Sequence, residues 1–177
     1  MAYKKSAYEA AALYLSRRMR TEKEVRDHLK VKEYSEEEAD EAVNELKAHR
    51  YIDDYEYARS FIEYGLARKH ASKRILRELA EKGVAADTAD FAYEDYVYEN
   101  GLDEYGEAKE HGFKLYRNAT EGKTFDDDTL EKVLARIARN LAGRGYSSGD
   151  IYKVLDDLRR MKAAEDTGDT YNTGDYE

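Results

Sequence analysis

Two adjacent carboxylates stand out in HRYIDDYEYA, the stretch of residues 49–58. Asp53 and Asp54 have the chemistry of metal ligands or of a general acid–base pair. An acidic pair that lacks an accompanying set of ligands is nevertheless a poor site of either kind. Asp53 also stands three residues before Glu56 at the start of a helical stretch, where a carboxylate can accept backbone N–H bonds and meet the positive end of the helix dipole. We therefore predict that Asp53, and Asp103 in a matching position, are helix caps.

No other set of residues has the spacing of a catalytic or metal site. The four histidines, at positions 28, 49, 70 and 111, lack HxxxH or similar ligand spacing. The GRG sequence at residues 143–145 follows no strand pattern and lacks the lysine and hydroxyl residue that end a phosphate-binding loop. No serine, histidine and aspartate combine into a set for nucleophilic catalysis. We predict that the chain is not an enzyme and that it binds neither a metal nor a cofactor.

The composition favours a helical chain without disulfides. Charged residues make up 39% and apolar residues 41% of the 177 residues, so the chain can build cores without large apolar patches. No run approaches the roughly 18 apolar residues that span a bilayer, and no apolar segment of a signal peptide follows the N-terminus. Cysteine is absent, which excludes disulfides and thiolate zinc sites and makes a reducing cytoplasm the simplest location. Because proline is also absent, nothing in the chain forces a helix to break.

An internal repeat organises the sequence. A shift of 50 places residues 51–58, YIDDYEYA, on residues 101–108, GLDEYGEA, and a further shift of 62 brings in a third copy. Three segments then agree at their apolar positions, namely residues 24–46, 74–96 and 136–158. Agreement across three copies indicates a helical repeat.

Apolar spacing and helix-start signals predict an all-α fold of tandem three-helix repeats. Within a copy the apolar residues recur at i, i+4 and i+7, as at Ala39, Val43 and Leu46. Capping-box pairs, in which a hydroxyl and a carboxylate satisfy backbone donors reciprocally, mark the helix starts. The pairs are Ser6 with Glu9, Thr21 with Glu24, Ser35 with Glu38 and, as a weaker copy, Ser147 with Asp150.

The repeat also predicts the boundaries of the parts. Each full unit reads helix, turn, helix, turn, helix, and the glycines at 83, 143 and 145 fall in the turn between the first and second helices. The predicted parts are an N-terminal capping helix at 1–20, repeats at 21–68 and 69–120, an incomplete third repeat at 121–163, and an acidic, disordered tail at 164–177.

Charge is unevenly distributed along the chain. The net charge of -9 disfavours nucleic-acid binding in bulk, but residues 33–46 and 83–108 carry many of the acids and no base. The bases gather on the first helices of the second and third repeats. This pattern is compatible with a solvated helix surface and with a band that binds an anionic partner, either a nucleic-acid backbone or an acidic protein surface. The candidate binding residues are Arg68, Lys69, Lys73, Arg74, Arg77, Lys82, Lys132, Arg136, Arg139 and Arg144.

Four motifs, taken in order, resemble the RecX family, the bacterial regulators of the RecA recombinase: RTEKEVRDHL, YIDDYEYA, SKRILRELAEKGV and NLAGRGYSSGDIYKVL. The likeness spans residues 13–158. It implies an elongated, curved array of three-helix repeats that lies in the groove of a RecA filament on single-stranded DNA. It also implies inhibition of recombinase, ATPase and coprotease activity in DNA recombination, DNA repair and the SOS response. The family has no catalytic activity, and we expect a monomer with no membrane partner.

The resemblance implies that the candidate residues contact that filament. Carried over by position, the basic helix of the second repeat and its third-repeat counterpart are expected to contact it, with a weak direct contact to DNA as an option. The alternative is a helical DNA-binding module that acts without a protein partner. Because the net charge of -9 and the acidic tail disfavour binding to free DNA, we expect the protein partner to dominate.

Overall fold

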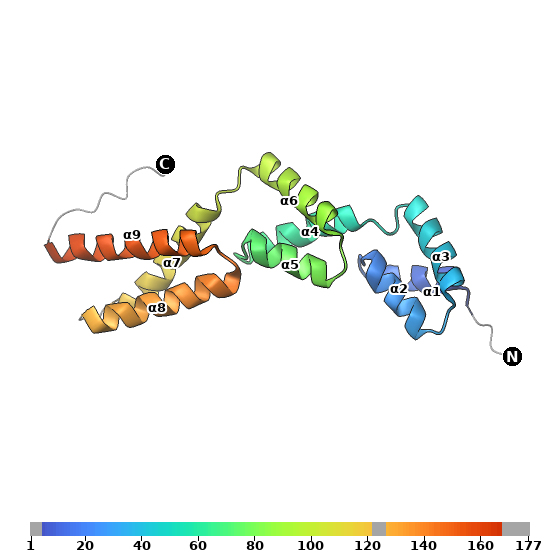
Figure 1. Cartoon of the computed structure of the whole chain (residues 1–177), viewed down its shortest axis with the longest axis horizontal. Coiled ribbons are helices and arrows are strands. Elements are labelled where there is room, and N and C mark those ends of the chain that lie inside the picture. The colour runs from blue at the N-terminus through green and yellow to red at the C-terminus, as the bar shows by residue number, and fades with distance from the viewer. Residues whose placement is uncertain (1–4, 122–126, 168–177) are drawn as a thin grey trace. The chain divides into compact units, whose positions relative to one another are not determined.

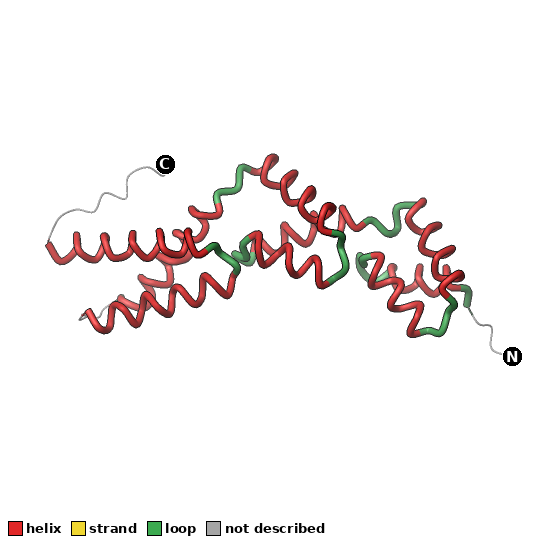
Figure 2. The backbone as a smooth tube through the Cα atoms, in the orientation of Figure 1, coloured by secondary structure: helices red, strands yellow, loops and turns green. Residues whose placement is uncertain are grey.

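Helices make up the regular structure of the described residues. The computed structural model describes residues 5–121 and 127–167, and these residues form nine α-helices and no strand (Figure 1, Figure 2). The helices are α1 (Ala7–Leu15), α2 (Glu22–Val31), α3 (Glu36–Ala48), α4 (Asp54–Ala67), α5 (Ser72–Glu81), α6 (Ala86–Asn100), α7 (Glu104–Thr120), α8 (Asp127–Arg144) and α9 (Ser148–Thr167). The predicted all-α fold is confirmed. Within the described residues, none of the helices combines the length and the apolar character that crossing a membrane requires.

Three clusters of buried side chains divide the helices into three modules. The first module comprises α1, α2 and α3, the second α4, α5 and α6, and the third α7, α8 and α9. Leucines occupy equivalent places in the three cores: Leu29, Leu79 and Leu141 are each 0% exposed. The apolar positions that the repeat aligned are therefore core positions.

The modules begin one helix earlier than the sequence-based boundaries at residues 21, 69 and 121. A pattern of alternating helices and turns repeats equally well from any of its helices, so its period alone does not fix where a unit begins. Packing does fix it: Ala7 and Ala11 bury α1 against the other two helices of the first module. The first helix is thus part of a module, and with this grouping the third module has all three of its helices.

Side-chain caps begin the helices where the sequence predicted them. In α1, α2 and α3 the N-cap hydroxyl accepts a backbone N–H of the first turn, and the carboxylate three residues later accepts the N–H of the N-cap. Ahead of α9, the Ser147 hydroxyl accepts the N–H of Asp150 at 3.1 Å. These bonds satisfy donors that a helix start would otherwise leave unpaired.

A left-handed residue follows the middle helix of each module at the same repeat position. Its φ is 60° at Glu33, 84° at Gly83 and 95° at Gly145. Gly143 does not lie in this turn as predicted, because α8 continues through it to Arg144. The turn is therefore a property of the repeat, and it occurs with glutamate as well as with glycine.

The contacts of the chain define two compact units. Among the described residues, one unit contains 5–68 and 75–101, and the other contains 69–74, 102–121 and 127–167. At the C-terminal end, α9 continues to Thr167, so residues 164–167 are helical although the sequence analysis placed them in the tail. The remainder of that predicted tail, from residue 168, lies outside the described residues.

Candidate partner-binding surface and the joints beneath it

Asp53 caps α4 as predicted. Its Oδ1 accepts the N–H groups of Tyr55 and Glu56, each at 3.1 Å. Asp103 occupies the N-cap position of α7, but within the described chain its side chain makes no capping hydrogen bond. No group of three or more potential metal-ligating side chains occurs in the described residues. Asp53 is therefore part of the architecture, and so is the backbone position of Asp103.

Asp54 caps a different helix from Asp53. Its Oδ1 accepts the N–H of Glu22, the first residue of α2, at 2.8 Å. Burial raises the pKa of the Asp54 carboxyl, because few water molecules can solvate its charge. The bond connects the start of α4 to the start of α2 within one compact unit. This role joins residues 32 positions apart and was not predicted from the sequence.

The same hydrogen bond recurs one repeat later. Glu104 accepts the N–H of Ser72, the first residue of α5, at 2.7 Å. Glu104 follows Asp54 by 50 residues, and Ser72 follows Glu22 by 50 residues, so acceptor and donor both obey the repeat. In the sequence, this pair is indicated by the 50-residue shift that aligns Glu104 with Asp54 and Ser72 with Glu22.

A second hydrogen bond accompanies each of these carboxylate bonds. The buried Thr21 hydroxyl donates to the carbonyl of Lys82 at 2.8 Å. The N–H of Ala71 donates to the carbonyl of Arg144 at 2.9 Å, and these two residues are the repeat equivalents of the first pair. We call the bonds to residues 21 and 22 the α2 joint, and the bonds to residues 71 and 72 the α5 joint.

Glycine allows both joints to close. A Cβ on Gly83 would lie 2.2 Å from the Cδ of Lys23, and a Cβ on Gly145 would lie 2.6 Å from the Cβ of Arg74. Each glycine directly follows the carbonyl that accepts a joint hydrogen bond. Glu33 has the same backbone conformation but is exposed, so its side chain has room. Close approach, added to positive φ, explains why the turn carries glycine only where a joint packs on it.

Three of the predicted binding cations serve the fold of the second compact unit. Lys69 pairs with Glu107, and this hydrogen bond raises the pKa of the lysine. Arg74 donates from Nη1 to the carbonyl of Gly143 at 2.9 Å. Arg144 donates from Nη1 to the carbonyl of Lys69 at 3.3 Å. These side chains surround the α5 joint, and their charges are engaged within the protein.

Two more of the predicted cations contact aromatic rings. Arg68 donates from Nη1 to the hydroxyl of Tyr64 at 2.6 Å. The Lys82 ammonium lies 5.5 Å from the centroid of the Phe61 ring, within the range of a cation–π interaction. The Arg68 and Lys82 side chains are thus positioned partly by these contacts within the protein.

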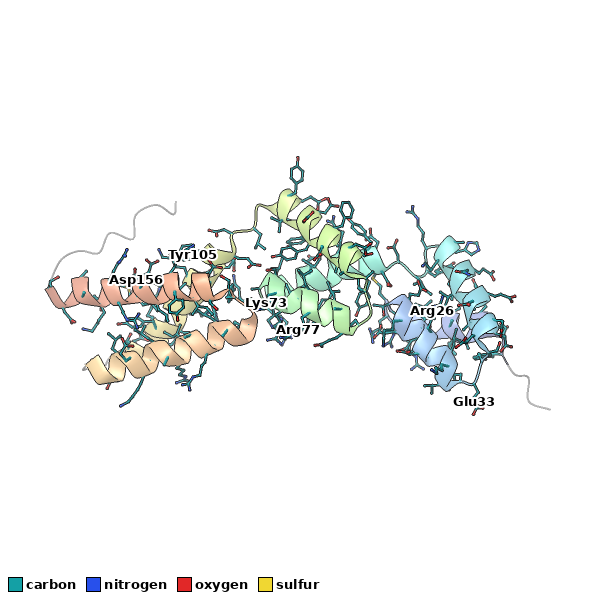
Figure 3. All side chains as sticks on the ribbon, in the orientation of Figure 1. Arg26, Glu33, Lys73, Arg77, Tyr105 and Asp156 are labelled. Atoms are coloured by element: carbon teal, nitrogen blue, oxygen red, sulfur yellow. The ribbon has the colours of Figure 1, made fainter. Side chains whose placement is uncertain are left out.

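The remaining five cations are exposed on the outer sides of two helices. They are Lys73 and Arg77 on α5 (Figure 3), and Lys132, Arg136 and Arg139 on α8. Spacings of three and four residues place the members of each set on one helix face. Arg77 lies 3.8 Å from Glu81, but both side chains are about two-thirds exposed, so this pair is weak. Within the described residues, neither Lys73 nor Arg136 has a hydrogen-bond or ion-pair partner.

Arg74 and Arg136, which the repeat aligns, have different surroundings. Arg74 lies in the first turn of the ten-residue helix α5, where its guanidinium bonds to the Gly143 carbonyl. Arg136 lies in the middle of the 18-residue helix α8 and is exposed. Because α8 extends further toward its N-terminus, the aligned arginines do not form equivalent parts of one surface. The candidate binding residues are therefore the exposed cations, taken helix by helix, and Arg74 supports the fold beside them.

The first two modules match descriptions of known three-helix domains. Residues 7–46 match the sequence profile of the first three-helix domain of RecX, and residues 53–92 match that of the second. These spans open with α1 and just before α4, in agreement with the grouping of the cores.

Curated relatives of the chain carry the name regulatory protein RecX. The protein of Oceanobacillus iheyensis is 34% identical over 162 residues, which are 91% of this chain and 55% of that protein. The protein of Vibrio campbellii is 33% identical over 151 residues, which are 85% of this chain and 90% of that protein. The protein of Caldanaerobacter subterraneus is 38% identical over 90 residues, 51% of this chain and 46% of that protein. The matches thus cover about half the length of the first and third of these relatives.

Two solved structures resemble the fold. The crystal structure of RecX from Lactobacillus salivarius superimposes with a TM-score of 0.70 at 25% identity, covering 87% of this chain and 95% of that one. A crystal structure of regulatory protein RecX superimposes with a TM-score of 0.66 at 25% identity, covering 85% of this chain and 70% of that one.

Proposed function

The chain belongs to the RecX family of regulatory proteins, and on that premise we propose that it binds the RecA filament on single-stranded DNA and inhibits its recombinase, ATPase and coprotease activities. It acts by occupying the filament in the cytoplasm and catalyses no reaction itself. The exposed cations of α5 and α8 are the observation on which the mode of binding rests.

The contact residues in this proposal are Lys73 and Arg77 on α5 and, as a separate set, the exposed cations of α8. These cations project from rigid elements: Ile75 and Leu79 bury the opposite face of α5, and Ile137 does the same for α8. A partner therefore meets charges whose helices are already ordered, which lowers the entropic cost of binding.

The filament suits this surface better than free DNA does. The net charge of -9 repels a bare phosphate backbone at long range, so in this proposal a protein partner supplies part of the contact. In this proposal short-range complementarity at α5 and α8 outweighs the unfavourable net charge.

The double variant Lys73→Glu/Arg77→Glu tests the proposal. We expect about tenfold more protein to be needed for half-inhibition of ATP hydrolysis by RecA on single-stranded DNA, corresponding to about 1.4 kcal/mol of binding free energy. The matched control is Lys30→Glu/Lys32→Glu, the same charge change at two exposed positions around the end of α2. Unchanged inhibition by the α5 variant would contradict the site, and an equal loss in the control would assign the effect to net charge.

A DNA-binding module without a protein partner is the second candidate, favoured by the exposed cations along α8. It requires tight binding to bare single strands, with a log–log salt slope of about -0.7 for each neutralised phosphate. Comparing bare DNA with RecA-coated DNA at several salt concentrations separates the two functions. Tight binding to the coated strand alone would exclude this candidate.

A further inference from the structure

The outer face of α6 carries an exposed stripe of acids and aromatic rings. Asp87, Phe91, Glu94 and Tyr98 follow one another at i, i+4, i+7 and i+11, which places them on one side of the helix. All four are exposed, and the exposed fraction is 59% for Phe91 and 91% for Tyr98. We call these four residues the α6 stripe.

The opposite side of α6 fixes the orientation of the stripe. Ala89 and Ala92 are buried in the core of the second module, with Tyr93 and Tyr96 packed against that core. Rotation of the helix that hid Phe91 and Tyr98 would expose these core residues. The outward direction of the stripe is therefore a consequence of the packing of the module.

The rings of the stripe are largely free of internal contacts. Phe91 meets Tyr55 on one side, with ring centroids 5.7 Å apart. Tyr98 has no hydrogen-bond or aromatic partner in the part of the chain that the structure describes. Two rings exposed to this extent on one helix face resemble the anchor residues of binding surfaces more than those of a solvated helix.

Only the second module carries these rings. Phe91 corresponds to Glu41 in α3 and to Lys153 in α9, and Tyr98 corresponds to Ala48 and Arg160. The repeat fold thus accommodates small, acidic and basic residues at these positions, so the fold does not require aromatic rings there.

The segment of the sequence that contains the stripe is acidic. Residues 83–108 contain eight acids and no base. Arg59 of α4 pairs with two other acids of α6, with Nη2 2.5 Å from Glu99 and Nη1 3.8 Å from Asp95. No ion pair to a basic residue is present at Asp87 or Glu94 within the described residues. The stripe therefore has two carboxylates for a cationic ligand beside two ring faces.

We propose that the α6 stripe binds an arginine-bearing segment of a protein partner. Guanidinium groups stack on aromatic faces and form paired hydrogen bonds with carboxylates, so arginine satisfies both components of the stripe at once. Lysine offers only a point charge and is the weaker ligand. Nucleic acids are repelled by the acids. The α6 stripe is negatively charged and shares no residue with the cations of α5 and α8. The proposal does not depend on the proposed function.

Titration of the full chain with nonaarginine and with nonalysine, followed by calorimetry, tests the proposal. We expect nonaarginine to bind more tightly, and we expect both Phe91→Ala/Tyr98→Ala and Asp87→Asn/Glu94→Gln to weaken it at least fivefold. The matched control Glu37→Gln/Glu41→Gln alters two exposed acids in α3, at the positions of Asp87 and Phe91, and should change affinity less than twofold. Circular dichroism confirms that each variant is folded.

Several outcomes would overturn the proposal. They are absent binding of nonaarginine, equal binding of the two peptides, and a loss in the α3 control equal to that in the stripe variants. Sedimentation velocity tests whether a second copy of the chain occupies the α6 stripe. A dimer that Phe91→Ala/Tyr98→Ala dissociates would show that the partner is the chain itself and not another protein. Binding of single-stranded DNA that this variant abolishes would likewise replace protein by nucleic acid.

Discussion

Helices α2 and α5 occupy the same place in successive repeats but have different outer faces. Each has ten residues, and each buries two apolar residues, Val25 and Leu29 in α2 and Ile75 and Leu79 in α5. Each also begins at a joint in which a later carboxylate accepts its first N–H. The inner face and the helix start are therefore shared.

The outer faces of the two helices differ. In α2, Glu24 lies 3.0 Å from Arg18 and Asp27 lies 2.8 Å from Lys23, so its acids are neutralised within the chain. In α5, Lys73 and Arg77 project outward as exposed cations. The comparison indicates that packing and joints constrain a small set of positions, while the exposed face of the same helix can differ between copies.

The largest effects are expected where the two helices are alike. Leu29→Ala and Leu79→Ala should each destabilise the protein by about 2–5 kcal/mol, because both side chains are fully buried and each substitution leaves a cavity. Urea denaturation followed by circular dichroism measures this loss. Val31→Ala, at a residue that is 79% exposed, is the control and should cost under about 1 kcal/mol. A mild effect of Leu79→Ala alone would show that the two cores are not equivalent.

The joints should give the next largest effect. Asp54→Ala and Glu104→Ala remove the acceptors of the Glu22 and Ser72 N–H groups, and each should cost about 1–3 kcal/mol. Asp54→Asn and Glu104→Gln should cost less, since an amide oxygen can still accept the bond. Amide hydrogen exchange at residues 22 and 72 measures each joint directly. Unaltered exchange at residue 72 in Glu104→Ala would contradict the equivalence of the joints.

A pH dependence should distinguish α2 from α5. Burial lowers the pKa of His28, which stacks on Tyr14 with centroids 4.0 Å apart, and the nearby charges of Lys32 and Arg20 act in the same direction. The unfolded chain therefore takes up this proton first, and stability should fall as pH drops through the ordinary histidine value of about 6.5 toward the lowered value. The equivalent residue of α5 is Glu78.

Urea midpoints between pH 5 and pH 7.5 measure this dependence. His28→Gln should reduce its slope, while His49→Gln, at an exposed position, serves as the control. Equal slopes for wild type and His28→Gln would show that His28 is not linked to stability.

The smallest effect on stability is expected where the helices differ. Asp27→Arg and Arg77→Asp exchange charges at equivalent exposed positions, and each should change the free energy of unfolding by less than about 1 kcal/mol. Binding to RecA filaments should weaken in Arg77→Asp and not in Asp27→Arg. A reversed order of affinities would assign the contact to α2.

Local signals explain what the sequence predicted. The capping boxes, the core positions and the Asp53 cap each depend on residues three to seven positions apart, and all were predictable from spacing. The assignment of helices to modules was not predictable in this way, because only packing decides which neighbours share a core. Gly143 was misplaced for a different reason: a helix can continue through one glycine when its neighbours favour it.

The candidate surface was less predictable than the fold. Charge and spacing identify cations on an outer helix face, but they do not reveal a main-chain acceptor such as the Gly143 carbonyl beside Arg74. The roles of Asp54 and Glu104 likewise depend on bonds across 32 positions of sequence. The supporting cations differ from the exposed ones because they have partners far away in the sequence. Spacing along a single sequence does not reveal such partners.

In each joint a carboxylate accepts the main-chain N–H of the first helical residue, so this bond does not constrain the side chain at that position. Glutamate occupies the position in α2 and serine occupies it in α5, yet the bond lengths differ by only about a tenth of an ångström, 2.8 Å against 2.7 Å. The sequence of such a helix can therefore change while the hydrogen bond at its first residue is kept. Duplicated copies of such a module can acquire new recognition faces one helix at a time, with no redesign of the contacts that hold the copies together.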